Sequence, residues 1–279
     1  MKLLNLAALV FLGTAPAVAD TAVPLTVSGQ QATAVVNLLG GLGIELEIGF
    51  EGVVGLNPGA LDVSVRLVSP LDPILPRLAA AGGLLPAALP LVIRIEPAQG
   101  SGMSFQGITT LSLHTENLVL NTLLPLSLFS SSGGEPFRDV TRSEGIGSYR
   151  VGGSTGGFSE FVIVLDQRNI NTVITGKFNA ITALLDTHAD RIAPDTLSAL
   201  QARLASARSL YNAMKKTAAA AEVGLFAEEV RAQSGTAIPD VWRANDPSVV
   251  NVAGALRGAA LTLKFSISRK PGLLGGLLP

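Results

Sequence analysis

The chain has 279 residues, of which 48% are hydrophobic, a formal net charge of −1 and no cysteine. This length and apolar content favour a folded protein with a large core over a disordered one. The balanced charge excludes a strongly basic nucleic-acid-binding protein, and the missing cysteine excludes disulfides, thiolate metal ligands and a cysteine nucleophile.

The first nineteen residues have the three parts of a secretory signal peptide. Lys2 precedes an apolar run over residues 3–12, and Ala17 and Ala19 lie at the −3 and −1 positions before Asp20. The apolar run is shorter than the roughly 20 residues that span a bilayer as a helix. We therefore expect residues 1–19 to be removed and the product to be periplasmic or extracellular. No later segment predicts a transmembrane helix.

Residues 20–165 alternate between apolar and other side chains, which is typical of strands with one buried face. The alternation is clearest in 44–50, 61–67, 91–95 and 158–165, and turn-forming residues separate these runs. Short strands with such turns predict an antiparallel β-sandwich over 20–165.

The long connection over residues 71–90 interrupts this pattern. Prolines at 73, 76, 86 and 90 permit only short helical pieces. It carries many leucines, as does the segment 273–278. Exposed apolar patches can bind partners or membranes, but we expect the connection to cover one face or end of the sandwich.

Residues 166–259 change to helical spacing and predict a small antiparallel bundle. Apolar residues between 170 and 185 recur every three or four positions and form one stripe. A second helix is expected to begin at Pro194, because proline is favoured at the first helical position. A third is expected to run through Phe226, and a fourth from about Asp246 to Gly258.

Alternation returns at residues 260–268, where Leu261, Leu263, Phe265 and Ile267 are separated by polar residues. This predicts a final strand that pairs with the edge of the N-terminal sheet, followed by an apolar tail over 269–279. The expected class is therefore α+β: an antiparallel β-sandwich, then a helical bundle, with a strand returning to the sheet. The bundle would be held rigidly against the sandwich.

Two resemblances accompany this layout. The segment 197–239, with its FAEEVRAQSG run at 226–235, resembles FIMAH, a small helical module of secreted bacterial proteins that has no assigned chemistry. The PFRDVT, GSYR and GFSEF runs beginning at 136, 147 and 157 resemble an uncharacterised family of secreted bacterial proteins. These resemblances imply export and interaction, and they transfer no functional site.

Ser154 lies in a Gly-x-Ser-x-Gly run, GGSTG at 152–156, which resembles the pattern of a nucleophile elbow. That motif requires a strand-to-helix turn, whereas this run lies between two predicted strands and suits a hairpin loop. His188, downstream, is expected on the solvent side of a helix. We therefore assign no catalytic residue. A hydrolase that uses Ser154, or a carboxylate pair near Glu160 and Asp166, is kept as an alternative.

Metal and cofactor sites are not expected. The two histidines, His114 and His188, are far apart in the sequence and lack neighbouring ligands for zinc. Asp166, Asn169 and Asn171 form the densest cluster of oxygen ligands and are weak calcium candidates. Helix capping explains them equally well.

The sequence contains one tryptophan, Trp242, and two tyrosines, too few for the aromatic platforms on which saccharides stack. We expect Trp242 to pack at the junction between sandwich and bundle. The sequence therefore favours a secreted, non-catalytic interaction or structural protein without a cofactor, whose partner is a protein or envelope component. The alternatives are the hydrolase described above and a binder of apolar ligands or of the envelope surface.

Overall fold

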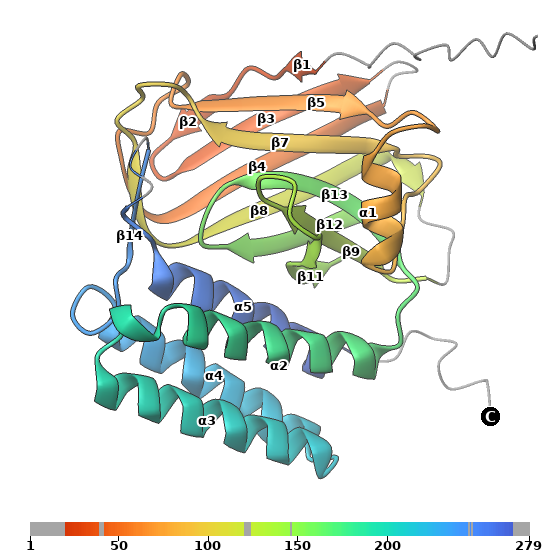
Figure 1. Ribbon diagram of the computed structural model, residues 1–279. Coiled ribbons are helices and arrows are strands. Elements are labelled where there is room, and N and C mark those ends of the chain that lie inside the picture. The colour runs from red at the N-terminus through yellow and green to blue at the C-terminus, as the bar shows by residue number, and fades with distance from the viewer. Residues whose placement is uncertain are drawn as a thin grey trace, which may run out of the picture.

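The computed structural model describes residues 20–38, 42–119, 124–145, 147–244, 246 and 248–269. The predicted signal peptide, the segment 273–278 and the rest of the tail beyond Arg269 lie outside the described residues. Two antiparallel sheets are followed by helices, which confirms the α+β class (Figure 1). α2, α3, α4 and α5 lie together beneath the strands in Figure 1, with α2 and α5 nearest to them.

The first sheet has the strand order β1-β5-β7-β13-β9-β10, with β6 paired to β13. Its strands are β1 (Thr21–Ala22), β5 (Leu61–Leu67), β6 (Gly83–Leu84), β7 (Leu91–Pro97), β9 (Leu126–Ser131), β10 (Arg138–Asp139) and β13 (Ser159–Asp166). The second sheet has the order β11-β12-β8-β4-β3-β2, with β14 paired to β8. Its strands are β2 (Thr26–Ser28), β3 (Gln31–Leu38), β4 (Leu42–Val54), β8 (Ser104–Val119), β11 (Thr141–Glu144), β12 (Ser148–Thr155) and β14 (Val241–Arg243).

The inner faces of the two sheets share one hydrophobic core. Ile44, Leu46 and Ile48 from β4 are buried in the same cluster as Ile93 from β7 and Ile163 from β13. The alternation that predicted strands also places these side chains on one face, because successive residues of a strand point to opposite sides. Apolar burial of this kind is the main favourable contribution to folding.

The proline-rich connection contains one short helix, α1 (Ile74–Ala80), as expected. Its Ile74 and Leu78 are buried against Phe129, Val162 and Val164 of the first sheet. This segment therefore covers the outer face of that sheet, which confirms the covering role. Leu71 remains largely exposed.

The helices are α2 (Ile170–Thr187), the short 3-10 helix η1 (Ala189–Arg191), α3 (Pro194–Asn212), α4 (Lys216–Gln233) and α5 (Val252–Ser268). The predicted stripe of α2 is buried in a second core shared with the other helices, and Pro194 begins α3 as expected. α5 also packs against β8, β11 and β12, so it joins the bundle to the second sheet.

The predicted final strand over 260–268 is wrong, because these residues form the second half of α5. The predicted start of the last helix at Asp246 is also wrong: the helix begins at Val252, after an Asn251 cap, and continues past Gly258. Its buried residues recur at three- and four-residue intervals through Leu256, Ala260, Leu263 and Ile267, a helical period that starts before the misread segment.

A different segment returns to the sheet. β14 lies between α4 and α5 and pairs with Ser104–Gln106 of β8. Trp242, at its centre, stacks on Phe105 with ring centroids 5.2 Å apart and meets Phe158 edge-on at 4.9 Å. This confirms Trp242 as a packing residue at the junction. Because β14 lies between α4 and α5 in the chain, it attaches the helical bundle to the second sheet at a point within the helical region.

The N-terminus of α5 approaches β8 so closely that position 254 has no room for a side chain. A Cβ on Gly254 would clash with the backbone oxygen of Gly107, to which the Asn251 amide donates a hydrogen bond of 2.6 Å. Gly254→Ala should therefore lower the free energy of unfolding by about 1–3 kcal/mol through overpacking. Chemical denaturation provides the measurement.

Gly176→Ala provides the matched control, because a Cβ at this position of α2 meets nothing within 4 Å. It should raise the stability by up to about 1 kcal/mol, since alanine favours the helix more than glycine does. Equal effects of the two substitutions would contradict the close packing of α5 on β8.

Candidate ligand-binding cavity

A cavity of about 590 Å³ lies between the sheets and the bundle. It is lined by the ends of β9, β10, β12 and β13, by one face of α2, by the first three turns of α5, and by Trp242, Arg243, Asp246 and residues 249–251. Its size falls within the roughly 300–1,000 Å³ that is usual for small-molecule sites. The cavity forms because the helical bundle packs against the two sheets, and both contribute to its lining.

Much of the wall is apolar. Phe158 and Trp242 contribute aromatic rings, and Leu184, Val249 and Val250 contribute aliphatic side chains. Alanines from α2 and α5 complete this surface. The cavity can therefore remove apolar ligand surface from water, at about 25 cal/mol per Å².

Among the described residues, the six charged ones that line the cavity lie in pairs of opposite sign. Arg138 bonds to Glu135 at 2.8 Å, Arg243 lies 3.9 Å from Asp246, and Lys177 lies 3.1 Å from Asp139. The first two pairs are solvent-exposed at the rim, whereas Lys177 and Asp139 are buried. The described part of the lining therefore carries no net charge.

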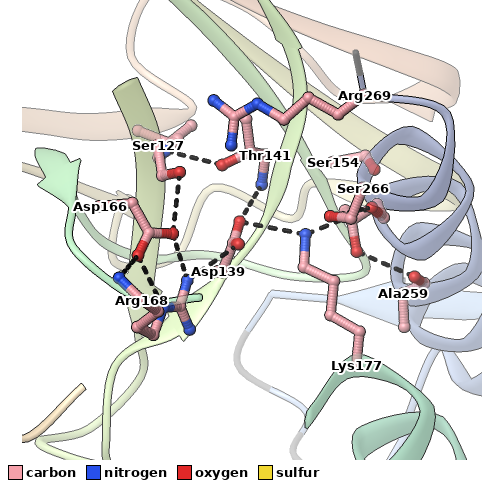
Figure 2. A network of polar contacts seen from close by, with 12 residues as sticks. Ser127, Asp139, Thr141, Ser154, Asp166, Arg168, Lys177, Ala259, Ser266 and Arg269 are labelled. Carbon is pink, nitrogen blue, oxygen red and sulfur yellow. Dashed lines mark hydrogen bonds and ion pairs between the residues drawn. The ribbon is translucent and has the colours of Figure 1, made fainter. Parts of the chain in front are cut away.

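Lys177 connects three elements at the cavity wall. From α2, its ammonium donates to Asp139 Oδ1 on β10 at 3.1 Å and to the backbone oxygen of Thr262 on α5 at 3.2 Å. Figure 2 shows Asp139 between Lys177 and Arg168. Lys177, Asp139 and Thr262 all line the cavity.

Arg168 extends this buried network toward the first sheet. Its guanidinium donates to Asp139 at 3.0 Å and to both oxygens of Asp166, at 2.8 and 2.6 Å. Ser127 also donates to Asp166, at 3.3 Å. The two cations and two carboxylates neutralise each other, which is required for charges that are removed from water.

Burial and neighbouring charges act in opposite directions on the Lys177–Asp139 pair. Burial lowers the pKa of Lys177. The contact with Asp139 offsets part of this decrease, whereas the charges of Arg168 and Arg269 add to it. Burial alone would raise the pKa of Asp139, but the charge of Lys177, the hydrogen bonds of Thr141 and the charge of Arg168 outweigh it. The pKa of Asp139 therefore lies below its usual 3.8.

Acid should weaken the fold through Asp139. Because its folded pKa is depressed, its contribution to stability is present above pH 3.8 and is lost as the pH falls through the folded pKa. Urea denaturation at neutral pH and below pH 3.8 should show this loss. In Asp139→Asn the difference between the two conditions should be smaller; an unchanged difference would contradict an ionised Asp139.

A family model described as a family of unknown function (DUF6689) matches residues 6–270. The chain belongs to this family. The match includes both sheets, the helices and every residue that lines the cavity. It confirms the resemblance to a family without an assigned activity. Searches of curated proteins and of solved structures found no match.

In this DUF6689 chain, Ser154 does not lie at a strand-to-helix turn. It is in β12, 2% exposed, and its hydroxyl donates to the backbone oxygen of Gly258 on α5 at 3.3 Å. His114 contacts Glu45 at 3.3 Å and Arg150 at 3.0 Å on the second sheet, and His188 follows α2. The structure does not bring either histidine to Ser154.

The three calcium candidates are engaged in other contacts. Asp166 accepts from Arg168, as described above. The side chain of Asn169 accepts from the backbone N–H of Asn171 and caps α2, and the side chain of Asn171 accepts from the Tyr211 hydroxyl at 2.6 Å. The capping explanation therefore holds for Asn169. Among the described residues, no group of three or more His, Cys, Asp or Glu is placed to hold a metal ion.

The carboxylate pair considered for hydrolysis is also separated. Glu160 and Asp166 lie six positions apart on β13, about 20 Å along an extended strand. Glu160 lies 3.5 Å from Arg77, and Asp166 binds Arg168.

Among the helices of the described residues, none is long and apolar enough to cross a membrane.

Lys177 has one local signal in the sequence that did not enter the predictions above. Lys177 lies four residues after Val173 and four before Ile181, on the apolar stripe of α2. A lysine on a buried stripe requires a partner of opposite charge or a functional reason. Its partner Asp139 and the cavity itself depend on contacts between distant segments, so they could not be read from local patterns.

Proposed function

We propose that this member of the DUF6689 family is an exported, non-catalytic binding protein whose ligand is a small, uncharged and largely apolar molecule held in the cavity. The volume and apolar wall of the cavity carry the proposal. Export is supported by the pattern of residues 1–19. Sequencing the N-terminus of the processed protein tests export, and Asp20 is the expected first residue.

Charge pairing supports an uncharged ligand. A carboxylate or ammonium group would leave water for a largely apolar site in which Lys177 and Asp139 already neutralise each other. Desolvating an unpaired charge is costly. A neutral apolar molecule avoids that cost and gains from burial against Phe158, Trp242 and Leu184.

Trp242 provides the readout, because it is the only tryptophan of the chain and lines the cavity. We expect a saturable change of its fluorescence on titration with 1-octanol. Octanoate and octylammonium, which carry the same chain with opposite charges, should bind more weakly. If the protein shows no saturable response to 1-octanol, or binds octanoate or octylammonium more tightly than 1-octanol, the proposal is contradicted.

Filling the cavity gives the matched test. Ala259→Phe on α5 places a ring in the cavity and should abolish the response to 1-octanol. Ala221→Phe on the exposed face of α4 adds the same ring elsewhere and should retain it. Equal responses in the two variants would show that the alcohol binds at another surface.

A further inference from the structure

Lys177 differs from the other described lysines. It is 8% exposed, whereas Lys215, Lys216 and Lys264 are solvent-exposed. It is also the lysine that lines the cavity. Its amine is therefore placed beside the cavity, whereas the other three described lysines are exposed outside its lining.

The geometry leaves the Lys177 amine partly available. An ammonium has three N–H donors. Two point to partners in the wall, Asp139 Oδ1 at 3.1 Å and the Thr262 oxygen at 3.2 Å. The third N–H has no partner among the described residues, and both partners of the amine belong to the cavity lining.

Two features favour a nucleophilic amine. Lysines become nucleophiles when desolvation or nearby cations increase the fraction of the free amine. Burial, which is the largest effect, and the charges of Arg168 and Arg269 lower the pKa of Lys177 and outweigh the opposite effect of Asp139. The adjacent Asp139 carboxylate can also accept and return a proton, because it lies within hydrogen-bonding distance of the nitrogen.

We propose that Lys177 Nζ captures a carbonyl-bearing ligand, an apolar aldehyde or ketone, by forming an imine in the cavity. This inference rests on the proposed binding function and names the ligand's reactive group. Lys177 first passes one proton to Asp139, and the free amine then attacks the carbonyl carbon. The carbonyl oxygen takes up one proton from the nitrogen and the proton held by Asp139 and leaves as water, while a carbon–nitrogen double bond replaces the carbon–oxygen double bond. One ammonium and one carbonyl give one protonated imine and one water, so atoms and charge balance.

The protonated imine fits the buried network. It keeps the positive charge and one N–H, so it can still donate to Asp139. The charge balance with Arg168 and Asp166 is therefore unchanged. The apolar wall disfavours the return of water, which protects the imine from hydrolysis.

Reduction of the imine provides the test. The purified protein is incubated with octanal and sodium cyanoborohydride, which converts an imine to a stable secondary amine. Intact mass should show one octyl group per chain, and peptide mapping should place it on Lys177. Labelling distributed over Lys215, Lys216, Lys264 or the amino terminus, without preference for Lys177, would overturn the inference.

Two variants separate capture from folding. Lys177→Arg keeps a cation beside Asp139 but cannot form an imine, and it should lose the label. Lys264→Arg changes an exposed lysine and should keep it. Because mapping of the unmodified chain locates the label directly, the conclusion does not depend on whether the Lys177 variant folds.

Binding of 1-octanol distinguishes a failure of imine capture from a failure of the proposed binding function. If the alcohol binds and octanal leaves Lys177 unlabelled, the binding function stands and imine capture is wrong. If neither molecule binds, both are wrong. Competition by 1-octanol should also reduce labelling of Lys177 by octanal, because both occupy the cavity; undiminished labelling at saturating alcohol would count against a reaction inside it.

Discussion

Lys177→Met should lower the free energy of unfolding by about 3 kcal/mol, at the lower end of the range for breaking a buried ion pair. The substitution leaves the Asp139 side chain, 5% exposed, without its lysine and removes the donor to the Thr262 oxygen. Arg168, at 3.0 Å, still neutralises part of the charge and limits the loss. Chemical denaturation at neutral pH measures the effect.

A double-mutant cycle shows whether the loss comes from the pair. Asp139→Asn combined with Lys177→Met removes both charges, so it should cost less than the sum of the single substitutions. Lys264→Met removes an exposed lysine and should change stability by no more than about 0.5 kcal/mol. Additive losses in the double variant would mean that the pair contributes nothing as a pair.

The parts of the fold that were predicted correctly are those determined by local patterns. Alternation over residues such as 61–67 and 91–95 predicted β5 and β7, because one face of each strand enters the shared core. The apolar stripe of α2 and Pro194 at the start of α3 were also local signals. Each depends only on neighbouring residues and the period of the element.

The wrong strand at 260–268 shows where local patterns stop. Alternation over a short stretch is compatible with a helix when polar residues can bond within it. Thr262 donates to the Ala259 oxygen at 2.9 Å and Ser266 to the Thr262 oxygen at 3.1 Å, so these polar groups are satisfied on a buried helix face. Small residues such as Gly254 and Gly258 let α5 approach the sheet.

The site was harder to predict than the fold. Ser154 was kept as an alternative because of a short motif and Asp166 because of a cluster of oxygen ligands, and the structure engages both in internal hydrogen bonds. Lys177 and Asp139 belong to no motif, because their relation comes from the docking of α2 beside β10. A charged residue on an apolar stripe was the available signal, and it identified neither the partner nor the cavity.

Phe105→Ala should be more damaging still, with an expected loss of about 3–5 kcal/mol in unfolding free energy. Phe105 is 1% exposed and lies between three aromatic rings. Its centroid is 5.5 Å from Phe50, 5.6 Å from Phe158 and 5.2 Å from Trp242. Truncation leaves a void and removes ring contacts that link the sandwich core to β14.

The same substitution should disturb the cavity, because Phe158 and Trp242 are both lining residues and both rest on Phe105. We expect the emission of Trp242 to shift to longer wavelength and the affinity for 1-octanol to fall. Val54→Ala provides the control, since Val54 lies opposite Ser104 on the same sheet and is 72% exposed. It should cost no more than about 0.5 kcal/mol and leave the emission unchanged. If Phe105→Ala lost stability with the emission and the binding of 1-octanol intact, the aromatic cluster would support the sheet alone, and the cavity wall would be held in place by α2 and α5.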